Sequence, residues 1–479
     1  MKTQVKNNER LRNFALAAVT IIVLAVFCFW ADLSLLIPLL LLFLGIHLFY
    51  FKKAHVKLFL QLGLLLTLII FTAYVMTRYY GEISYLYIPI SCVGMLTILL
   101  FGDLQLSFMM ALLSSVLGGL IVGNDFHFML ISFVGSLTAI YSVKDARTRG
   151  KLIEAGFFVG LIQVVAFILL NPTSEFIFTR DFVLKYAKPL MLNGIICAIV
   201  VMVSSKIFEM LFGVLTNFSL LELSDFNQPL LKRLVLEAPG TYHHSLVVSN
   251  IAESAADAIG ANALLTRVGA YYHDVGKMLK PVYFTENQMV DGSKHDNLEP
   301  SISRLVILNH VKDGVELAKK YKLSQHIIDF IPQHHGTSLI YYFYQRALED
   351  AGQDETVEQE NFRYAGPKPQ SRETAIVLLA DSVEGAVRAL SEPTPNRIDE
   401  VVRKVINNKF IDGQLDECDL TLKNIEVIGA TFTRVLSAMY HTRIKYPEKR
   451  NGNGNHNRKS SEANFSKPHS DDQDDQEDS

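Results

Sequence analysis

The sequence predicts an all-α protein in two parts, a polytopic transmembrane helical bundle followed by a cytosolic all-α domain. Of its 479 residues, 50% are hydrophobic and only 19% are charged, which is more apolar than an ordinary globular protein. Nearly all of the excess lies before about Gly213, in long apolar runs. Beyond that point, apolar residues recur at three- and four-residue spacing, which is typical of helices that pack in water. The two parts are therefore expected to fold in different solvents.

The first part contains eight apolar runs that approach the roughly 20 helical residues needed to span a bilayer. They lie at roughly 14–30, 34–51, 58–76, 85–102, 105–122, 126–143, 154–171 and 187–212. The second run follows the first too closely for a cleaved signal peptide, and Phe27, Phe29 and Trp30 replace the small residues that cleavage requires. We expect a cytosolic N-terminus at 1–13 and a transmembrane domain of about eight spans at 14–213.

Positive charges between the runs predict the orientation in the membrane. Basic residues precede the first run and follow the second and the sixth, which places all of them on one side if there are eight spans. These residues are Lys2, Lys6, Arg10, Arg12, Lys52, Lys53, Lys57, Lys144, Arg147, Arg149 and Lys151. We expect both termini and the soluble domain to be cytosolic. The four cysteines form no CxxC pair, which fits a reducing compartment.

Helical periodicity continues through the second part of the chain. Helices are predicted over about 234–259, 263–272, 301–320, 325–331, 373–390 and 425–440, with a break at Pro239-Gly240. Residues 281–300 and 350–372 are expected to be irregular. We divide this part into a linker at 214–239, a helical domain at 240–446 and a disordered tail at 447–479 that is rich in Asn, Gly, Ser and Asp.

Histidines gather in one stretch of the second part. Eight of the fourteen histidines fall between residues 243 and 335. A lone histidine is more often a surface or core residue than a ligand, but several beside acidic residues indicate a metal site. Asp274 follows His273 at the end of an apolar helix, and Asp381 lies inside another one, where a helix cap or a salt bridge is the alternative. Burying an unpaired carboxylate costs several kcal/mol, and a metal ion would supply the partner.

Seven side chains are candidate metal ligands with nitrogen or oxygen donors, namely His244, His273, Asp274, His310, His334, His335 and Asp381. This set is too large for one tetrahedral zinc ion and suits two ions bridged by a carboxylate. Imidazole and carboxylate together favour iron or manganese over magnesium. Two such ions, about 3.5 to 4 Å apart, suit the in-line hydrolysis of a phosphodiester. Lys277 would then hold a phosphate oxygen, and Gly336 would end the helix so that His334 and His335 reach different atoms.

The seven residues, in the order His244, His273-Asp274, His310, His334-His335 and Asp381, resemble the HD-domain phosphohydrolases. Longer segments are similar to the seven-transmembrane HD-domain family of PgpH-like cyclic di-AMP phosphodiesterases, at 236–245, 269–274, 310–316, 366–371 and 412–420. The resemblance runs from the second apolar run to about Pro447. It implies a multi-pass protein of the bacterial inner (cytoplasmic) membrane that hydrolyses cyclic di-AMP to linear pApA with two manganese or iron ions.

The resemblance also implies which residues hold which ion. By position, one ion would take His244, His273, Asp274 and Asp381, and the other would take Asp274, His310, His334 and His335. Asp274 would be the bridge and, with Lys277, the catalytic residue. Family members typically carry a sizeable extracytoplasmic domain after their first span. Only about three residues around Asp32 separate the first two spans here, so we expect that domain to be absent.

Other polar residues of the second part are weaker candidates. Arg363, Tyr364 and Lys368 lie in a segment shared with the family and are candidate contacts for a base or a phosphate, as is Lys277; a loop held by its prolines is the alternative. Three histidines are expected to be outside the metal set: His243, which would support its neighbour or be exposed, and His295 and His326, which would lie on the surface.

Several rival functions stay open at this point. A cyclic di-GMP phosphodiesterase of the HD-GYP type would have Gly-Tyr-Pro after the histidine pair, and none follows His335 here. Another nucleotide phosphohydrolase could use the same ligands, whereas a non-catalytic transducer would have lost some of them. A transporter would have charged or broken spans, and Pro89 is the main such feature. We expect a cyclic dinucleotide and the lipid bilayer as partners and no DNA or RNA, and we leave a homodimer open.

Overall fold

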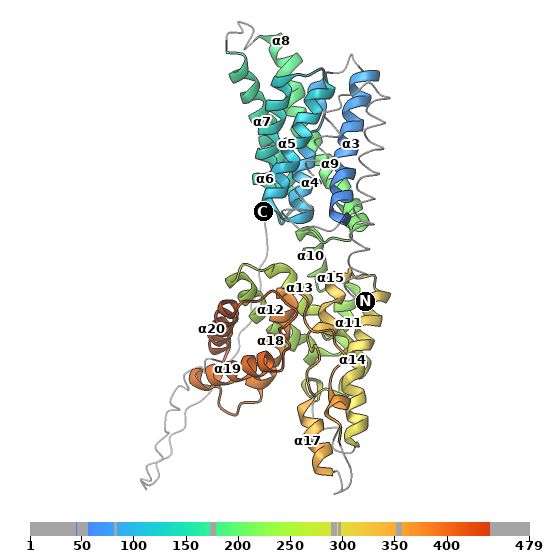
Figure 1. Ribbon diagram of the computed structural model, residues 1–479, viewed down its shortest axis with the longest axis vertical. Helices are drawn as coiled ribbons and strands as arrows, with labels where there is room; N and C mark the ends of the chain where they lie inside the picture. Colours follow the sequence, from blue (N-terminus) through green and yellow to red (C-terminus); the bar gives the residue numbers. More distant parts are fainter. Residues whose placement is uncertain are drawn as a thin grey trace, which may run out of the picture.

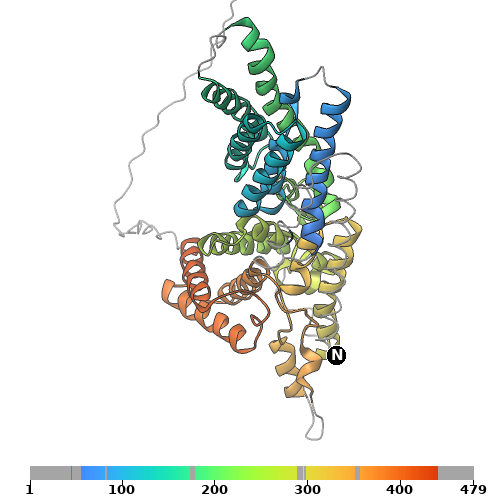
Figure 2. The same ribbon diagram turned by 45° about the horizontal axis from the view of Figure 1, so that its top comes forward.

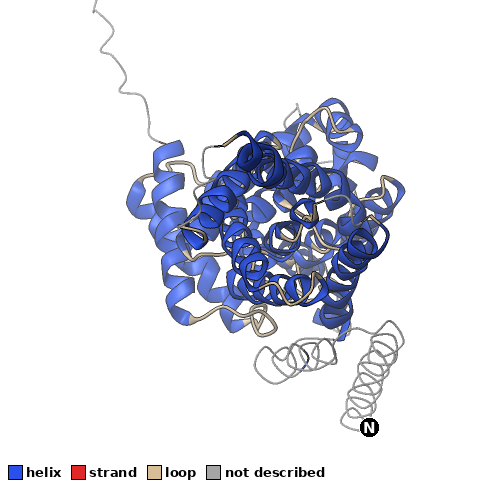
Figure 3. Ribbon diagram, turned by 90° about the horizontal axis from the view of Figure 1, so that it is seen from above, coloured by secondary structure: helices blue, strands red, loops and turns tan. Residues whose placement is uncertain are grey.

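The computed structural model of the chain describes residues 45, 56–80, 84–172, 179–288, 295, 298–350 and 357–440. Within these ranges the protein is helical, and the only β-type pairing is one isolated bridge between Leu339 and Arg363. Figure 1 shows two stacked parts, a bundle of long helices and a second helical domain below it, with α10 (Asn217–Leu223) between them. Seen along the long axis, both parts are built from helices joined by short loops (Figure 3). The predicted all-α architecture in two parts is confirmed.

The membrane domain comprises the helices that precede α10. They are α3 (Val56–Tyr79), α4 (Ser91–Phe101), α5 (Leu104–Ile121), α6 (Phe126–Val143), α7 (Gly150–Leu170), α8 (Arg180–Phe182) and α9 (Lys188–Phe212). Five segments of the described chain are long and apolar enough to cross a membrane: Lys57–Tyr79, Leu104–Ile121, Phe126–Val143, Gly150–Leu170 and Arg180–Phe212. The expected spans at 14–30 and 34–51 lie outside the described residues, apart from Gly45.

The apolar run at 85–102 departs from the prediction of one continuous spanning helix. A short 3-10 turn at Tyr85–Tyr87 precedes α4, and Pro89 lies in the break between them. Proline lacks a backbone N–H and clashes with the preceding turn, so it interrupts a helix. Two carbonyls beside the break accept from another helix, because the Asn193 side chain on α9 donates to Leu86 O at 2.9 Å and to Ile88 O at 2.7 Å; Ile88 O also accepts from Ile90 N at 2.8 Å. The break is therefore part of the packing of α9 against α4.

The C-terminal domain extends from α11 to α20. Its helices are α11 (Pro229–Glu237), α12 (Pro239–Ala258), α13 (Ala263–Tyr272), α14 (Pro300–Lys320), α15 (Gln325–Ile328), α16 (Phe330–Gln333), α17 (Tyr341–Asp350), α18 (Arg372–Arg388), α19 (Pro395–Ile411) and α20 (Leu422–Met439). The six predicted helical segments are present, with the first one divided at Ala238 and the fourth divided into α15 and α16. The sequence pattern missed α10, α17 and α19.

Two apolar clusters build the C-terminal domain. One joins α12 and α18 to α19 and α20, and the other joins α11 and α13 to α14 and α15. Figure 2 shows the first group, ending in red, on one side of the domain and α14 with α17 on the other. Helix α18 is buried on all sides over residues 375–380, which are apolar and 0% exposed. Polar side chains that converge between the two clusters are therefore removed from bulk water.

The two parts of the molecule meet at α10 through a small set of hydrogen bonds. Buried Glu209, near the end of α9, accepts hydrogen bonds from Thr216 N at 2.9 Å and Ser219 Oγ at 2.6 Å. At the other end of α10, the Tyr272 hydroxyl donates to Leu223 O at 2.8 Å. Tyr272 is the last residue of α13, so the residue after it belongs to the polar cluster in the C-terminal domain.

Candidate metal centre

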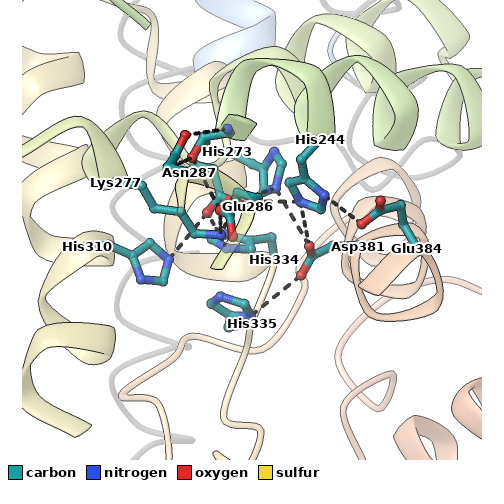
Figure 4. A network of polar contacts seen from close by, with 12 residues as sticks. His244, His273, Lys277, Glu286, Asn287, His310, His334, His335, Asp381 and Glu384 are labelled. Carbon is teal, nitrogen blue, oxygen red and sulfur yellow. Dashed lines mark hydrogen bonds and ion pairs between the residues drawn. The ribbon is translucent and has the colours of Figure 1, made fainter. Parts of the chain in front are cut away.

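The seven predicted ligands come from five helices and meet at one place in the C-terminal domain (Figure 4). Helices α12, α14 and α18 contribute His244, His310 and Asp381, while the ends of α13 and α16 contribute the pairs His273-Asp274 and His334-His335. They form two groups of four, in each of which one ligand atom per residue lies within 4.8 Å of the others: His244, His273, Asp274 and Asp381, and Asp274, His310, His334 and His335. Asp274 belongs to both groups.

Helix ends allow neighbouring residues to point into the same site. Helix α13 stops at Tyr272, and a 3-10 turn at Val275–Leu279 follows His273 and Asp274. Gly276 in that turn permits α14 to approach, because a Cβ there would lie 1.8 Å from His310 O. Gly336 has a φ of +54°, which favours glycine and ends the turn after His335. The expected role of Gly336 in ending the helix is confirmed.

Three of the histidines are oriented by the backbone of their own helix. The Nδ1–H groups of His273, His310 and His334 donate to the carbonyls of Ala270 at 2.7 Å, Ile307 at 2.5 Å and Ile331 at 2.6 Å. A carbonyl oxygen can only accept, so the proton must lie on Nδ1. When each ring is neutral, its Nε2 lone pair then faces the centre of the cluster. This is the arrangement in which histidine binds metals.

Four atoms that face the centre have no hydrogen-bond partner among the described residues. They are Nε2 of His273, His310 and His334 and Asp274 Oδ1, all of them fully buried, whereas Asp274 Oδ2 lies 2.7 Å from Lys277 Nζ. Buried polar atoms are paired in the great majority of folded proteins, so four unpaired atoms at one point require an explanation. A divalent cation is the partner that suits imidazole nitrogen and carboxylate oxygen together. The residues therefore fit a metal centre.

Burial and neighbouring charges shift the pKa values of the cluster residues in different directions. Burial lowers the pKa of His310 to about 3, although Asp274 opposes the shift, so this imidazole is neutral at pH 7. Burial also lowers the pKa of His273, but the adjacent Asp274 carboxylate outweighs it and raises the pKa to about 10. Burial alone would raise the pKa of Asp274, yet the charges of Lys277 and His273 hold it well below its usual range. The carboxylate is thus ionised and ready to act as a ligand.

Lys277 lies beside the shared carboxylate. Its Nζ is 2.7 Å from Asp274 Oδ2 and 2.9 Å from Glu286 Oε1, and only 13% of its side chain is exposed. Glu286 also accepts a hydrogen bond from the Thr241 hydroxyl at 3.2 Å. The ammonium group therefore supplies positive charge to two buried carboxylates. Glu286 was not predicted, and Gly240 was its one available signal, because a Cβ on Gly240 would lie 1.8 Å from Glu286 O.

A second unpredicted residue, Glu384, contacts the site from α18. Its Oε2 lies 2.7 Å from His244 Nδ1, while Asp381 Oδ1 lies 3.0 Å from His244 Nε2. Positions three apart on a helix share a face, so Asp381 and Glu384 reach the same imidazole. The spacing of the two acidic residues is visible in the sequence and could have identified this contact.

The three candidate substrate contacts differ in whether their side chains are already held by other residues. Arg363 donates to Asp412 at 2.9 Å and to Thr337 O at 2.8 Å, and Lys368 lies 3.6 Å from Asp416. Tyr364 stacks on the ring of the candidate ligand His335, with centroids 4.1 Å apart and planes inclined by 21°. Tyr364 also borders a hollow of about 400 Å³ lined by α14 residues such as Leu308 and Val311. It is the best placed of the three to meet a ligand.

The other three histidines between residues 243 and 335 differ in how exposed they are. His243 is exposed, which is one of its two predicted outcomes. His326 is exposed as predicted, and its Nε2 lies 3.1 Å from Gly213 O at the end of the membrane domain. The prediction that His295 lies on the surface is wrong. It is 4% exposed, because its ring packs against Phe343 and its Nε2 bonds to Tyr283 O at 2.8 Å.

An all-helical domain with this ligand order, joined to a block of apolar helices, defines the class of membrane-attached HD domains. The family described as 7TM receptor with intracellular HD hydrolase matches residues 29–216, and the HD domain family matches residues 241–386. The chain belongs to the seven-transmembrane HD family.

Three relatives illustrate the similarity. Cyclic-di-AMP phosphodiesterase PgpH of Bacillus subtilis is 36% identical over 429 residues, covering 85% of this chain and 59% of that protein. PgpH of Listeria monocytogenes is 44% identical over 324 residues, covering 67% of this chain and 44% of that protein. The crystal structure of the L. monocytogenes PgpH HD domain in complex with cyclic-di-AMP is 49% identical and covers 45% of this chain and all of that one, with a TM-score of 0.44. The chain thus spans about half the length of the curated relatives it matches.

Proposed function

We propose that this chain is a membrane-anchored, metal-dependent phosphodiesterase that hydrolyses cyclic di-AMP to linear pApA and so lowers the level of this second messenger. The observation that carries the proposal is the pair of four-ligand groups that share Asp274. The substrate is inferred from the PgpH relatives, which are cyclic-di-AMP phosphodiesterases. The soluble domain would face the cytosol of a bacterium, on the inner side of the cytoplasmic membrane.

The metal centre would take one ion on each group. His244, His273, Asp274 and Asp381 would hold the first, and Asp274, His310, His334 and His335 would hold the second. Manganese or iron suits these donors best, because the set mixes imidazole with carboxylate and has no thiolate. When bound, two such ions supply Lewis acidity and an activated water for in-line displacement at phosphorus.

The residues of the chain would position and shield the reactants. His335 and Asp381 are the most exposed members of the cluster, with 19% and 14% of their side chains accessible, so the phosphodiester would enter from their side. Tyr364 stacks on His335 and would offer its remaining surface to a base. The adjacent hollow, whose α14 wall combines apolar residues with the charged Lys312, Glu316 and Lys319, would accommodate the rest of the nucleotide. Lys277 would keep Asp274 ionised and oriented rather than contact the phosphate freely.

The test is hydrolysis by the purified full-length chain in detergent micelles with Mn²⁺, comparing cyclic di-AMP with cyclic di-GMP. We expect linear pApA from the first and little product from the second. Asp274→Ala should reduce cleavage to background with an unchanged far-UV circular dichroism spectrum, because it removes a ligand from both groups. Asp257→Ala, an exposed aspartate on α12, is the matched control and should retain activity. Cleavage of another nucleotide with cyclic di-AMP left intact would refute the substrate, and binding without cleavage would refute the enzyme.

A further inference from the structure

His244 differs from the other histidines of the site in how its ring is held. His273, His310 and His334 each donate Nδ1–H to a carbonyl three residues earlier in their own chain segment. The Nδ1 of His244 instead meets Glu384 Oε2 at 2.7 Å, from a residue 140 positions further along the chain. Its orientation therefore depends on the packing of α12 against α18.

Glu384 is an unusual residue to find in that place. It is 3% exposed and belongs to α18, whose buried residues are apolar apart from Thr374 and Glu384 itself, with Asp381 one turn earlier on the same face. A buried carboxylate is costly unless it is paired, and its other oxygen meets only the half-exposed Arg388 at 3.3 Å. The pairing with His244 is thus the main compensation for burying Glu384.

A carboxylate on the distal nitrogen affects a metal-binding histidine in two ways. It fixes the tautomer and the ring plane, and it makes the facing nitrogen a better electron donor than a carbonyl partner would. Among the described residues, only the group that contains His244 has a carboxylate hydrogen-bonded to Nδ1 of a candidate ligand. Nδ1 of His310 and His334 bonds to backbone carbonyls, and Nδ1 of His335 lies 3.8 Å from Asp381, which is itself a candidate ligand. The two metal positions are therefore supported unequally.

We infer that Glu384 is a positioning residue for the metal position formed by His244, His273, Asp274 and Asp381, and that it makes this position bind its cation more tightly. The inference rests on the proposed metal centre. Glu384 acts only through His244, on its Nδ1 side, and does not contact the substrate. Its removal should therefore weaken one of the two positions selectively.

The experiment is a titration of the metal-free full-length chain in detergent with Mn²⁺, following free Mn²⁺ by electron paramagnetic resonance. We expect two ions per wild-type chain. Glu384→Ala should weaken one of the two positions about 10- to 100-fold and leave the other in place. Glu384→Gln has the same shape and keeps an acceptor for Nδ1–H, so it should restore part of the lost affinity. The matched control is Glu373→Ala, which removes a carboxylate from the first turn of the same helix, where it accepts from Asn262 N; it should bind as wild type.

A Mn²⁺ titration of His244→Ala distinguishes failure of the proposed metal centre from failure of the proposed role of Glu384. If His244→Ala loses one ion and Glu384→Ala binds two with wild-type affinity, the role of Glu384 is refuted while the metal centre stands. If the wild-type chain or His244→Ala fails to show the expected stoichiometry, the metal centre itself is refuted. Loss of both ions in Glu384→Ala would also contradict the inference, because the second group does not contact Glu384. A spectrum of coupled Mn²⁺ ions at two equivalents per chain in the wild type that is lost in Glu384→Ala at the same loading would support it.

Discussion

The membrane domain and the C-terminal domain treat buried polar groups in opposite ways. In the membrane domain, hydroxyls return to the carbonyl one turn earlier, as Thr97 does to Val93 O at 2.7 Å and Ser136 to Ser132 O at 2.8 Å. Unpaired atoms there are single and scattered, such as Ser115 Oγ. In the C-terminal domain, four unpaired atoms meet within one cluster, namely Nε2 of His273, His310 and His334 and Asp274 Oδ1. Lipid offers no partner for a free polar group, whereas a soluble domain can reserve unpaired atoms for a ligand.

The comparison predicts how substitution of a buried polar side chain changes the stability of each domain. The membrane domain uses polar side chains to complete its own structure, so removing one should destabilise the fold. The metal centre holds polar side chains at a cost to the metal-free fold, which is the usual trade between stability and activity at functional sites. The same kind of substitution should therefore have effects of opposite sign in the two domains.

The largest effect is expected for Asn193→Ala in the membrane domain. The substitution removes a donor to Leu86 O and Ile88 O beside the Pro89 break and leaves Leu86 O without its donor in an apolar interior, while Ile88 O keeps its bond from the backbone N–H two residues later. It should cost about 2 kcal/mol or more. Thermal unfolding would be followed by thiol labelling of buried Cys92 and Cys197, with Cys28 and Cys418 replaced by alanine. Leu192→Ala, on the exposed side of the same helix, should change the midpoint little; equal shifts for the two variants would contradict the assignment.

His310→Leu should shift stability in the opposite direction. The imidazole is neutral and buried, because burial lowers its pKa to about 3, so the substitution removes no charge at pH 7. It does remove an orphaned Nε2, and the metal-free domain should gain about 1 kcal/mol. Unfolding would be followed by labelling of Cys418 with the other three cysteines replaced. With Mn²⁺ added, the wild type should gain stability and the variant should gain less. A variant less stable than wild type in both conditions would show that His310 is only a packing residue.

The residue pattern was sufficient to predict the helical class and which seven side chains converge; that they bind metal stays a prediction. Apolar periodicity revealed most helices, and the His273-Asp274 and His334-His335 pairs at helix ends indicated one convergent cluster. Asp381 could be suspected because a charged residue in an apolar helix needs a partner. The structure brings it within 3.0 Å of His244, from a distant part of the chain.

What the pattern missed depends on tertiary contact. Glu384 shares a helix face with Asp381, but only the packing of α12 against α18 shows that it reaches His244, and Glu286 is an ordinary loop glutamate in the sequence until it meets Lys277 and Thr241. His295 is buried by Phe343, on a helix that the periodicity did not reveal. Likewise, an apolar run in the sequence does not reveal whether Pro89 is tolerated within one helix or ends it. That depends on the hydrogen-bond donor that α9 supplies, the side chain of Asn193. Each miss is a contact between segments far apart in the sequence.

The smallest effect is expected where the two domains join, at Tyr272→Phe. The hydroxyl of this fully buried residue donates to Leu223 O at the end of α10, and the next residue is the candidate ligand His273. Losing one neutral hydrogen bond should cost about 1 kcal/mol while the ring keeps its packing. Hydrogen exchange at the end of α10 should quicken, and Mn²⁺ affinity should stay within about twofold if the backbone of α13 alone orients His273 through Ala270 O. A loss of metal affinity comparable to that of Glu384→Ala would instead mean that the junction with the membrane domain sets the position of His273, and that the two domains are coupled through this one hydroxyl.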